Sequence, residues 1–179
     1  MRSILHRLFY IVTLTAISGS AVATQLCQES NITPTNPISR FEVSSDGTVV
    51  DTTTGLMWQR CLVVQGGQNC ETGDVLSETW AGALTYLVDE SAHANLAGYK
   101  DWRMPNIREL ASIVELQCGN PAINVNLFPN NSAGHVWSSS PYRFYLHYSW
   151  YLDFNDGILT YGDRQDKKAF RLVRLLKPH

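Results

Sequence analysis

The chain has 179 residues, with 14 basic and 16 acidic side chains and a formal net charge of −2. This length is enough for one domain with a hydrophobic core and little more. The mildly acidic balance provides no overall field that would attract a phosphate backbone, which argues against a nucleic-acid partner.

Residues 1–23 have the layout of a secretory signal peptide. Arg2 and Arg7 precede the apolar run LFYIVTLTAI, and a stretch of small residues ends in Ala21-Val22-Ala23. The apolar run is too short and too rich in threonine and serine to span a bilayer comfortably. We therefore expect cleavage after Ala23, export, and no transmembrane segment in the mature chain.

All four cysteines lie in the mature chain, which export would carry into an oxidising compartment where disulfides persist. Four cysteines allow three pairings. Cys61 and Cys70 flank LVVQGGQN, a glycine-rich loop that can bring its ends together, so we expect disulfides Cys61–Cys70 and Cys27–Cys118. The second would pin an extended N-terminal arm, residues 24–39, to the body of the domain. These spacings match no zinc pattern, and we predict no metal site.

Residues 40–51 predict a β-hairpin. Asp46-Gly47 is a favoured two-residue turn, and such a turn would place Val43 opposite Val50. The following segment, TTTGLMWQRC, continues as a turn and a strand that carries Trp58.

A first helix is predicted from about Glu78 to His93, with Ser77 as its N-cap. The prediction rests on one apolar stripe at helical spacing, formed by Trp80, Leu84, Leu87 and Val88. We expect this stripe to face the core.

A second helix is predicted to begin after Pro105, because Asn106 and Glu109 have capping-box spacing. Its apolar face would be Ile107, Leu110, Ile113 and Val114, and Gly119-Asn120-Pro121 would end it. Within DWRMPNIREL, Arg103 and Arg108 could grip an anion. The structural interpretation is favoured: Trp102 lies in the core, Arg103 pairs with a carboxylate or carbonyl, and Arg108 and Glu109 lie on the exposed side.

From residue 121 onward, aromatic residues alternate with polar ones and with turn signals, which predicts several antiparallel strands. The stretch YLDFNDGILTYG invites comparison with a calcium loop. An EF-hand loop that began at Asp153 would have Gly157 at position five and Arg164 at position twelve, so the pattern fails twice. A hairpin with Asp156-Gly157 as a two-residue loop is favoured, and it would pair Phe154 with Leu159 and Leu152 with Tyr161.

Seven stretches follow one another in a recognisable order: DTTTGLMWQRC, WAGALTYL, LAGYKDWRMPNIRELASIVE, CGNPAINVNLFP, VWSSSPY, WYLDFNDG and RLVR. In this order they resemble the Lcl C-terminal domain family, the domain that closes the Legionella collagen-like adhesins. The resemblance implies a domain over residues 40–179 with an α+β, C-type-lectin-like fold, in which two helices flank antiparallel sheets and the N- and C-terminal strands pair. It also implies a bacterial protein of the periplasm or cell surface with an adhesion-type role, and sulfated glycans are ligands of the family's best-known member.

The fold reopens the calcium question, because calcium-dependent C-type lectins carry Trp-Asn-Asp where this chain has Phe154-Asn155-Asp156. Residues 134–150 lack the Glu-Pro-Asn or Gln-Pro-Asp loop of such sites, and three side chains cannot supply the oxygens that calcium takes. Catalysis finds little support either. Ser138, Ser139 and Ser140 are not in a G-x-S-x-G elbow, and His93, His135 and His147 form no metal-binding pair, although the last two could meet beside the serines.

We therefore expect a non-catalytic binding module without a cofactor, whose partner is a glycan or a cell-envelope protein. Alternation predicts that Tyr148, Trp150, Leu152 and Phe154 face inward. Outward and loop positions suited to stacking and hydrogen bonding are Tyr142, Arg143, Tyr145, His147, Tyr151, Asp153 and Asn155. An alternative, anion-binding cluster is Lys167, Lys168, Arg171, Arg174 and Lys177. The alternative function is that of a structural or accessory subunit of an envelope or surface assembly.

Overall fold

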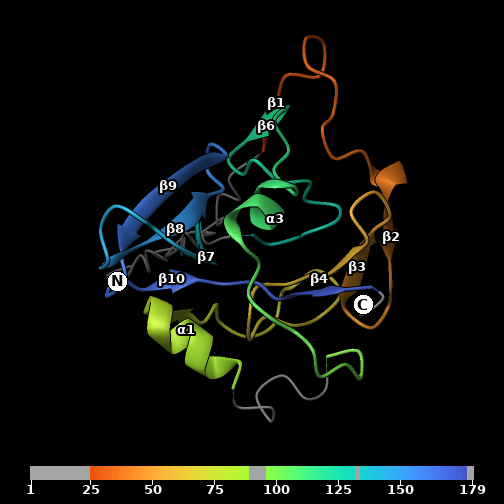
Figure 1. Ribbon diagram of the computed structural model, residues 1–179. Helices are drawn as coiled ribbons and strands as arrows, with labels where there is room; N and C mark the ends of the chain where they lie inside the picture. Colours follow the sequence, from red (N-terminus) through yellow and green to blue (C-terminus); the bar gives the residue numbers. More distant parts are fainter. Residues whose placement is uncertain (1–24, 89–95, 132–133, 177–179) are drawn as a thin grey trace, which may run out of the picture.

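The computed structural model describes residues 25–88, 96–131 and 134–176. The predicted signal peptide, residues 89–93 of the first predicted helix, and Lys177 lie outside these ranges. The described parts form a mixed α+β fold in which two short helices pack beside antiparallel sheets (Figure 1).

One sheet has four strands in the order β11-β4-β3-β2. Three of them come from the N-terminal part of the chain and one from its C-terminal end: β2 (Phe41–Val43), β3 (Thr48–Asp51), β4 (Leu56–Gln59) and β11 (Val173–Leu175). The C-terminal strand thus joins the sheet that the early strands build, and its partner there is β4. The first strand, β1 (Leu26–Cys27), pairs instead with β6 (Cys118–Gly119), to which the Cys27–Cys118 disulfide also ties it.

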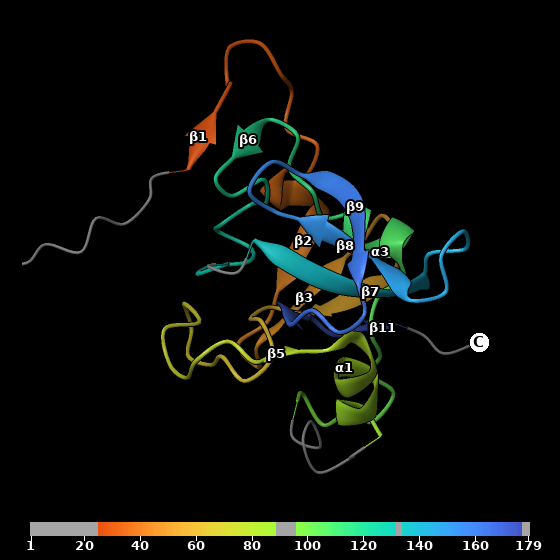
Figure 2. The ribbon, with the colours of Figure 1, turned by 90° about the vertical axis from the view of Figure 1, so that its left-hand side faces the viewer.

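The second large sheet has five strands in the order β5-β10-β7-β8-β9. Its members are β5 (Ser77–Glu78), β7 (His135–Pro141), β8 (Tyr148–Asp153), β9 (Ile158–Asp163) and β10 (Lys168–Ala169). Only the contact between β10 and β7 is parallel; the other neighbours run antiparallel. Figure 2 shows β7, β8 and β9 together, with β9 at the edge of the sheet.

The two helices are shorter than the sequence predicts. Helix α1 (Trp80–Tyr86) is capped by Thr79, whose hydroxyl accepts from the Gly82 amide. The predicted cap, Ser77, lies in β5 instead and pairs with β10. Helix α3 (Ile107–Ala111) has the predicted capping box between Asn106 and Glu109, and it ends at Ser112, before the predicted stop. A 3-10 turn (Ile38–Arg40) precedes β2. Neither helix of the described ranges has the length and apolar content that crossing a membrane requires.

The predicted β2–β3 hairpin is present with a different register. Val43 lies opposite Val49 rather than Val50, and the Ser44 amide donates to the Thr48 carbonyl at 2.9 Å. Three residues, Ser45 to Gly47, therefore form the loop. A three-residue loop needs a left-handed final residue, and Gly47 supplies it with a φ of +85°.

The β8–β9 hairpin also differs from its predicted register. Leu152 pairs with Leu159 and Trp150 with Tyr161, so the loop has four residues, 154–157. Phe154 is wholly buried in this loop, and its amide donates to the Gly134 carbonyl. The two-residue loop is wrong because burial draws Phe154 into the core and out of the strand pairing.

The core consists of two clusters of buried side chains. One lies between α3 and the sheets and includes Trp58, Leu110 and Phe154; the other lies beside α1 and includes Trp137 and Phe170. The C-terminal segment from β10 to β11 runs between the two large sheets and contributes to both clusters (Figure 1). The predicted disulfides Cys61–Cys70 and Cys27–Cys118 are both present.

A buried ion pair fixes the turn that joins β3 to β4. Asp51 has no exposed surface, and its carboxylate pairs with the Arg40 guanidinium and accepts from the Thr53 amide and the Thr54 hydroxyl. Burial alone would raise the pKa of the Asp51 carboxyl, but the hydrogen bonds from Arg40, Thr54 and Thr53 outweigh it and lower the pKa below its ordinary value.

We expect Asp51→Ala to lower the free energy of unfolding by about 2–4 kcal/mol, because it leaves Arg40 and the turn donors without their acceptor. The measurement is urea unfolding followed by circular dichroism. Asp74→Ala, at an exposed acidic position, is the matched control and is expected to change stability little. Equal unfolding curves for the two variants would contradict the role given to Asp51.

Stability is expected to fall in acid. The pKa values of Asp51 and Glu115 are lowered in the fold: burial opposes this, and hydrogen bonds to each carboxylate outweigh the burial. A carboxyl whose pKa is lower in the folded than in the unfolded protein stabilises the fold at any pH above its pKa in the unfolded chain, which is 3.8 for aspartate and 4.5 for glutamate. This stabilisation is lost as the pH falls through the pKa that the carboxyl has in the folded protein. Melting temperatures measured from about pH 7 to about pH 2 should drop below about pH 4, and less steeply in Asp51→Asn. A flat profile would contradict this.

Candidate functional site

Aromatic side chains gather where β7 turns into β8. The connecting residues, 142–147, are held by backbone hydrogen bonds from Tyr142 to Tyr148 at 3.1 Å and from Tyr148 to Tyr145 at 3.0 Å. The neighbouring strand β9 adds Tyr161. We call this set the aromatic surface, and its members are Tyr142, Phe144, Tyr145, His147, Tyr148, Trp150 and Tyr161.

The rings of the aromatic surface contact one another in a fixed arrangement. Tyr142 lies at the centre, stacked on Tyr161 with ring centroids 4.1 Å apart and on Tyr145 at 6.1 Å. Trp150 meets the Tyr142 ring edge-on at 5.2 Å, and Phe144 meets it at 5.6 Å. Such pairs are individually weak, but together they hold the loop side chains against the sheet.

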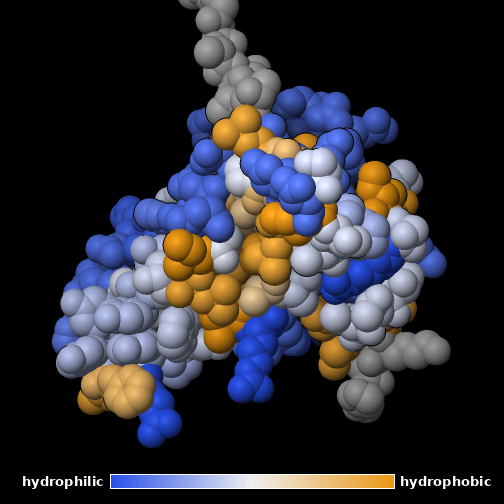
Figure 3. All heavy atoms as spheres, turned by 90° about the horizontal axis from the view of Figure 1, so that it is seen from above, coloured by the Kyte–Doolittle hydropathy of each residue, from blue (hydrophilic) through white to orange (hydrophobic). Residues whose placement is uncertain are grey.

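The aromatic surface remains open to solvent despite these contacts. Phe144 is 69% exposed, Tyr145 54% and Tyr161 44%, and the adjoining Leu146 is 84% exposed. In Figure 3 the side of the molecule on which β8 and β9 lie carries a pale area of intermediate hydropathy, with hydrophilic side chains on one side of it and hydrophobic side chains on another. Exposed apolar surface of this kind marks interaction sites more often than chance positions.

Two arginines, Arg143 and Arg164, lie at the border of the aromatic surface. Loss of hydration and the adjacent Tyr161 raise the pKa of the Tyr142 phenol, so its ring stays uncharged at neutral pH. The Arg143 guanidinium lies over the Phe144 ring, 5.0 Å from its centroid. Arg164 borders the site and donates to the Tyr148 carbonyl and the Ser149 hydroxyl, which leaves it tied to the scaffold.

The predicted binding residues do not all lie together. Tyr142, Tyr145 and His147 belong to the aromatic surface, and Arg143 lies at its border. Tyr151 and Asp153 lie on the other face of β8. Asn155 is exposed in the β8–β9 loop, where its carbonyl accepts from Asn120 at 2.8 Å.

Tyr151 does not point freely into solvent as predicted. Its ring is half-buried, edge-on against Trp137 at 5.8 Å, with the Lys168 ammonium 4.6 Å from its centroid. Asp153 pairs with His135 at 3.1 Å. Contacts within the fold therefore cover the second face of β8. The residues that strict alternation places outward lie partly on the aromatic surface and partly on this covered face.

The prediction also missed four members of the aromatic surface: Phe144, Tyr148, Trp150 and Tyr161. Tyr148 and Trp150 do share a face with the buried Leu152, as alternation predicts, but they are only partly buried. Leu152 lies in the core cluster that contains α3 residues, whereas Tyr148 and Trp150 pack among the exposed rings. The neighbours of Tyr148 and Trp150 are rings from the β7–β8 connection and from β9, and alternation along one strand does not predict such neighbours.

The basic cluster near the C-terminus is not an exposed anion-binding surface. Lys168, Arg171 and Arg174 are buried, and each has partners within the fold. Lys168 pairs with Asp166, Arg174 pairs with Asp101, and Arg171 donates to the carbonyls of Gln59 and Arg60 and to Asn131. Lys167 is exposed, and Lys177 lies outside the described residues. The cluster interpretation is wrong because adjacent basic residues point into different parts of the fold.

The segment DWRMPNIREL has the predicted structural role. Trp102 is buried, and Arg103 forms two hydrogen bonds with the Glu109 carboxylate, at 2.7 and 2.6 Å. Glu109 is therefore partnered and only half-exposed, whereas Arg108 is exposed as expected. Hydrogen bonding and attraction to Glu109 raise the pKa of Arg103, with burial opposing them.

The three serines of VWSSSPY also serve the scaffold. Ser138 donates to the Trp150 carbonyl, Ser139 to the Pro105 carbonyl, and Ser140 accepts from the Ile107 amide. His135 lies opposite Asp153 and His147 precedes Tyr148, so the two histidines lie at opposite ends of β8 and do not meet beside the serines. His93 lies outside the described residues. Within those residues, no three acidic, histidine or cysteine side chains converge as a metal site would require.

These features define a disulfide-linked α+β domain with an exposed aromatic surface. The chain belongs to the Lcl C-terminal domain family, whose model matches residues 47–174, more than half of the sequence. This is a family of non-catalytic domains from bacterial adhesin-like proteins. A comparison with curated proteins finds no match.

Substitution of the exposed rings should leave the fold intact. Phe144→Ala and Tyr145→Ala are expected to change the free energy of unfolding by less than about 1 kcal/mol, since both side chains are mostly exposed. Trp137→Ala, in the same sheet but fully buried, should cost about 3–5 kcal/mol. Thermal unfolding of the three variants tests this, and a large loss in Tyr145→Ala would mean that the loop is part of the core.

Proposed function

We propose that this protein is an exported, non-catalytic recognition module and that it binds carbohydrate on its aromatic surface. The observation that carries the proposal is the exposed and mutually packed group of rings around Tyr142. Tyrosine and tryptophan side chains offer flat apolar faces for the C–H faces of a sugar ring, and their polar atoms can bond its hydroxyls.

The arrangement of the rings reduces the cost of binding. Tyr142 is already stacked on Tyr161, and Arg164 holds the backbone of the loop through its bonds at residues 147 and 148. Side chains that are ordered before the ligand arrives lose little rotamer freedom on binding. A ligand with a flat apolar face would therefore gain most of its contact energy without rearranging the loop.

Export is supported by the two disulfides and by the signal-like N-terminal sequence. The α+β arrangement is compatible with the C-type-lectin-like fold that the family resemblance implies. The charge distribution bears on the type of glycan. Sulfate groups would find Arg143 at the border of the aromatic surface, while the buried cations of the C-terminal segment are engaged. The proposal thus favours ring stacking over charge as the main source of affinity.

The alternative is a subunit of an envelope or surface assembly, with the aromatic surface packed against another protein chain. Exposed aromatic patches also occur at protein interfaces, so the same rings suit both functions. The two differ in the state of the purified protein. A glycan binder remains a monomer until it meets its sugar, whereas an assembly subunit is recovered in larger complexes from its native envelope.

The deciding experiment is a glycan array that includes neutral and sulfated chains, probed at physiological salt with the oxidised protein. Tyr145→Ala should weaken binding of the glycans bound by the original protein by about tenfold, the equivalent of about 1.4 kcal/mol. Glu42→Ala, an exposed change on β2 of the four-stranded sheet, is the control and should bind normally. A blank array for the folded protein would overturn the carbohydrate proposal and favour the assembly role.

A further inference from the structure

A polar pocket lies on the four-stranded sheet, away from the aromatic surface. It has a volume of about 580 Å³, within the range of about 300–1,000 Å³ that is usual for small-molecule sites. The β2–β3 hairpin loop forms one wall, the end of β4 the floor, and the loop closed by Cys61–Cys70 the other wall. Figure 1 places β2 and β3 on the opposite side of the molecule from β8 and β9.

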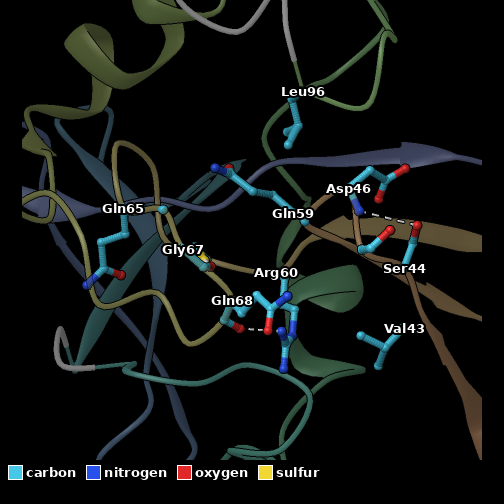
Figure 4. Close-up of a pocket in the computed structure, with 13 residues that line it drawn as sticks. Val43, Ser44, Asp46, Gln59, Arg60, Gln65, Gly67, Gln68 and Leu96 are labelled. Atoms are coloured by element: carbon cyan, nitrogen blue, oxygen red, sulfur yellow. Dashed lines mark hydrogen bonds between the residues drawn. The ribbon is translucent and has the colours of Figure 1, made fainter.

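The close-up in Figure 4 shows how the lining side chains are arranged. Gln59 extends from β4 toward the side of the disulfide loop, while Ser44 and Asp46 approach from the hairpin and Gln68 lies on the disulfide loop beside Arg60. The Gln65 side chain points away from the hairpin. The pocket therefore presents amides, hydroxyls and glycine backbone together with apolar surface from Val43 and Leu96.

The two ionisable groups that line the pocket are already satisfied. Arg60 donates to the carbonyls of Leu127, Gln68 and Asn126. Asp46 accepts from the amide and hydroxyl of Thr48. Their charges are opposite and their hydrogen bonds are internal, so the pocket has no free charge with which to select an ion.

The unsatisfied hydrogen-bonding groups are neutral. Among the described residues, the Oε1 atoms of Gln59 and Gln65 are shielded from solvent and have no hydrogen-bond partner. A buried acceptor without a donor is unfavourable, and such atoms are uncommon in folded proteins. The terminal torsion of glutamine is broad, so a modest rotation of the Gln59 amide would present its oxygen to a donor in the pocket.

We propose that this pocket binds a small, neutral, polyhydroxylated molecule, a sugar unit or a polyol, whose hydroxyls donate to the Gln59 amide oxygen and bond the hairpin hydroxyls. Hydroxyl groups both donate and accept, which matches a wall of amides, serine hydroxyls and backbone groups. The pocket is separate from the aromatic surface, and its function does not depend on carbohydrate binding there.

The test uses the ¹⁵N-labelled protein with both disulfides formed, titrated with glucose and, separately, with glycerol. We expect saturable shifts of the Gln59 side-chain amide and of the Ser45 and Gly67 backbone amides in the NMR spectrum. Saturation by glucose alone assigns the pocket to a sugar unit, and saturation by both assigns it to polyols in general. Absence of saturable shifts with both probes would overturn the proposal. Binding of glucose 6-sulfate as tight as that of glucose would also overturn it, because the pocket would then show no preference for neutral ligands.

Two variants locate the binding. Gln59→Met removes an amide oxygen that has no partner, so it should not lower the melting temperature, yet it should weaken binding about tenfold. Ser45→Trp, at an exposed loop position, should fill the mouth of the pocket and abolish the shifts. Gln165→Met, an exposed change outside the pocket, is the control and should leave the shifts of the pocket residues unchanged. Unchanged binding by a folded Ser45→Trp would overturn the proposal, whereas loss of glycan binding by Tyr145→Ala concerns only the aromatic surface.

Discussion

The architecture depends on how the C-terminal segment crosses between the two large sheets. Within a few residues, β10 pairs with β7 and β5, and β11 pairs with β4. Between them, Arg171 is fully buried and bonds the carbonyls of Gln59 and Arg60, and burial lowers the pKa of its guanidinium to about 9. A buried cation that is held by backbone carbonyls is costly to form and tolerates little displacement, so it fixes how the two sheets meet.

Both surfaces to which we assign binding are built on this framework. The aromatic surface lies where β7 turns into β8, beside Tyr161 of the edge strand β9. The polar pocket lies where β4 leaves the four-stranded sheet and enters the Cys61–Cys70 loop, next to the carbonyls that Arg171 holds. Each site thus combines side chains from loops with a rigid strand. Because the strand holds the loops in place, little conformational entropy is lost when a ligand binds.

The conspicuous polar residues of the sequence have hydrogen-bond or ion-pair partners within the fold. The serines of VWSSSPY bond backbone groups, the basic residues of the C-terminal segment are paired internally, and Arg103 is committed to Glu109. Side chains that hold the scaffold in this way are not free to move protons or to grip an anion. The aromatic surface and the polar pocket present exposed rings and neutral amides, whose chemistry is stacking and hydrogen bonding.

The sequence by itself determined the α+β class, both disulfide pairings, the capping box of α3 and the family, because each depends on residues close in the chain or on a pattern spread along it. Only the tertiary structure decided the two hairpin registers and the extent of the aromatic surface. Phe154 is fully buried and lies outside the strand pairing, and Trp150 is only partly buried because its neighbours are the rings of the aromatic surface. Burial of this kind is set by neighbours distant in sequence, which local periodicity does not record.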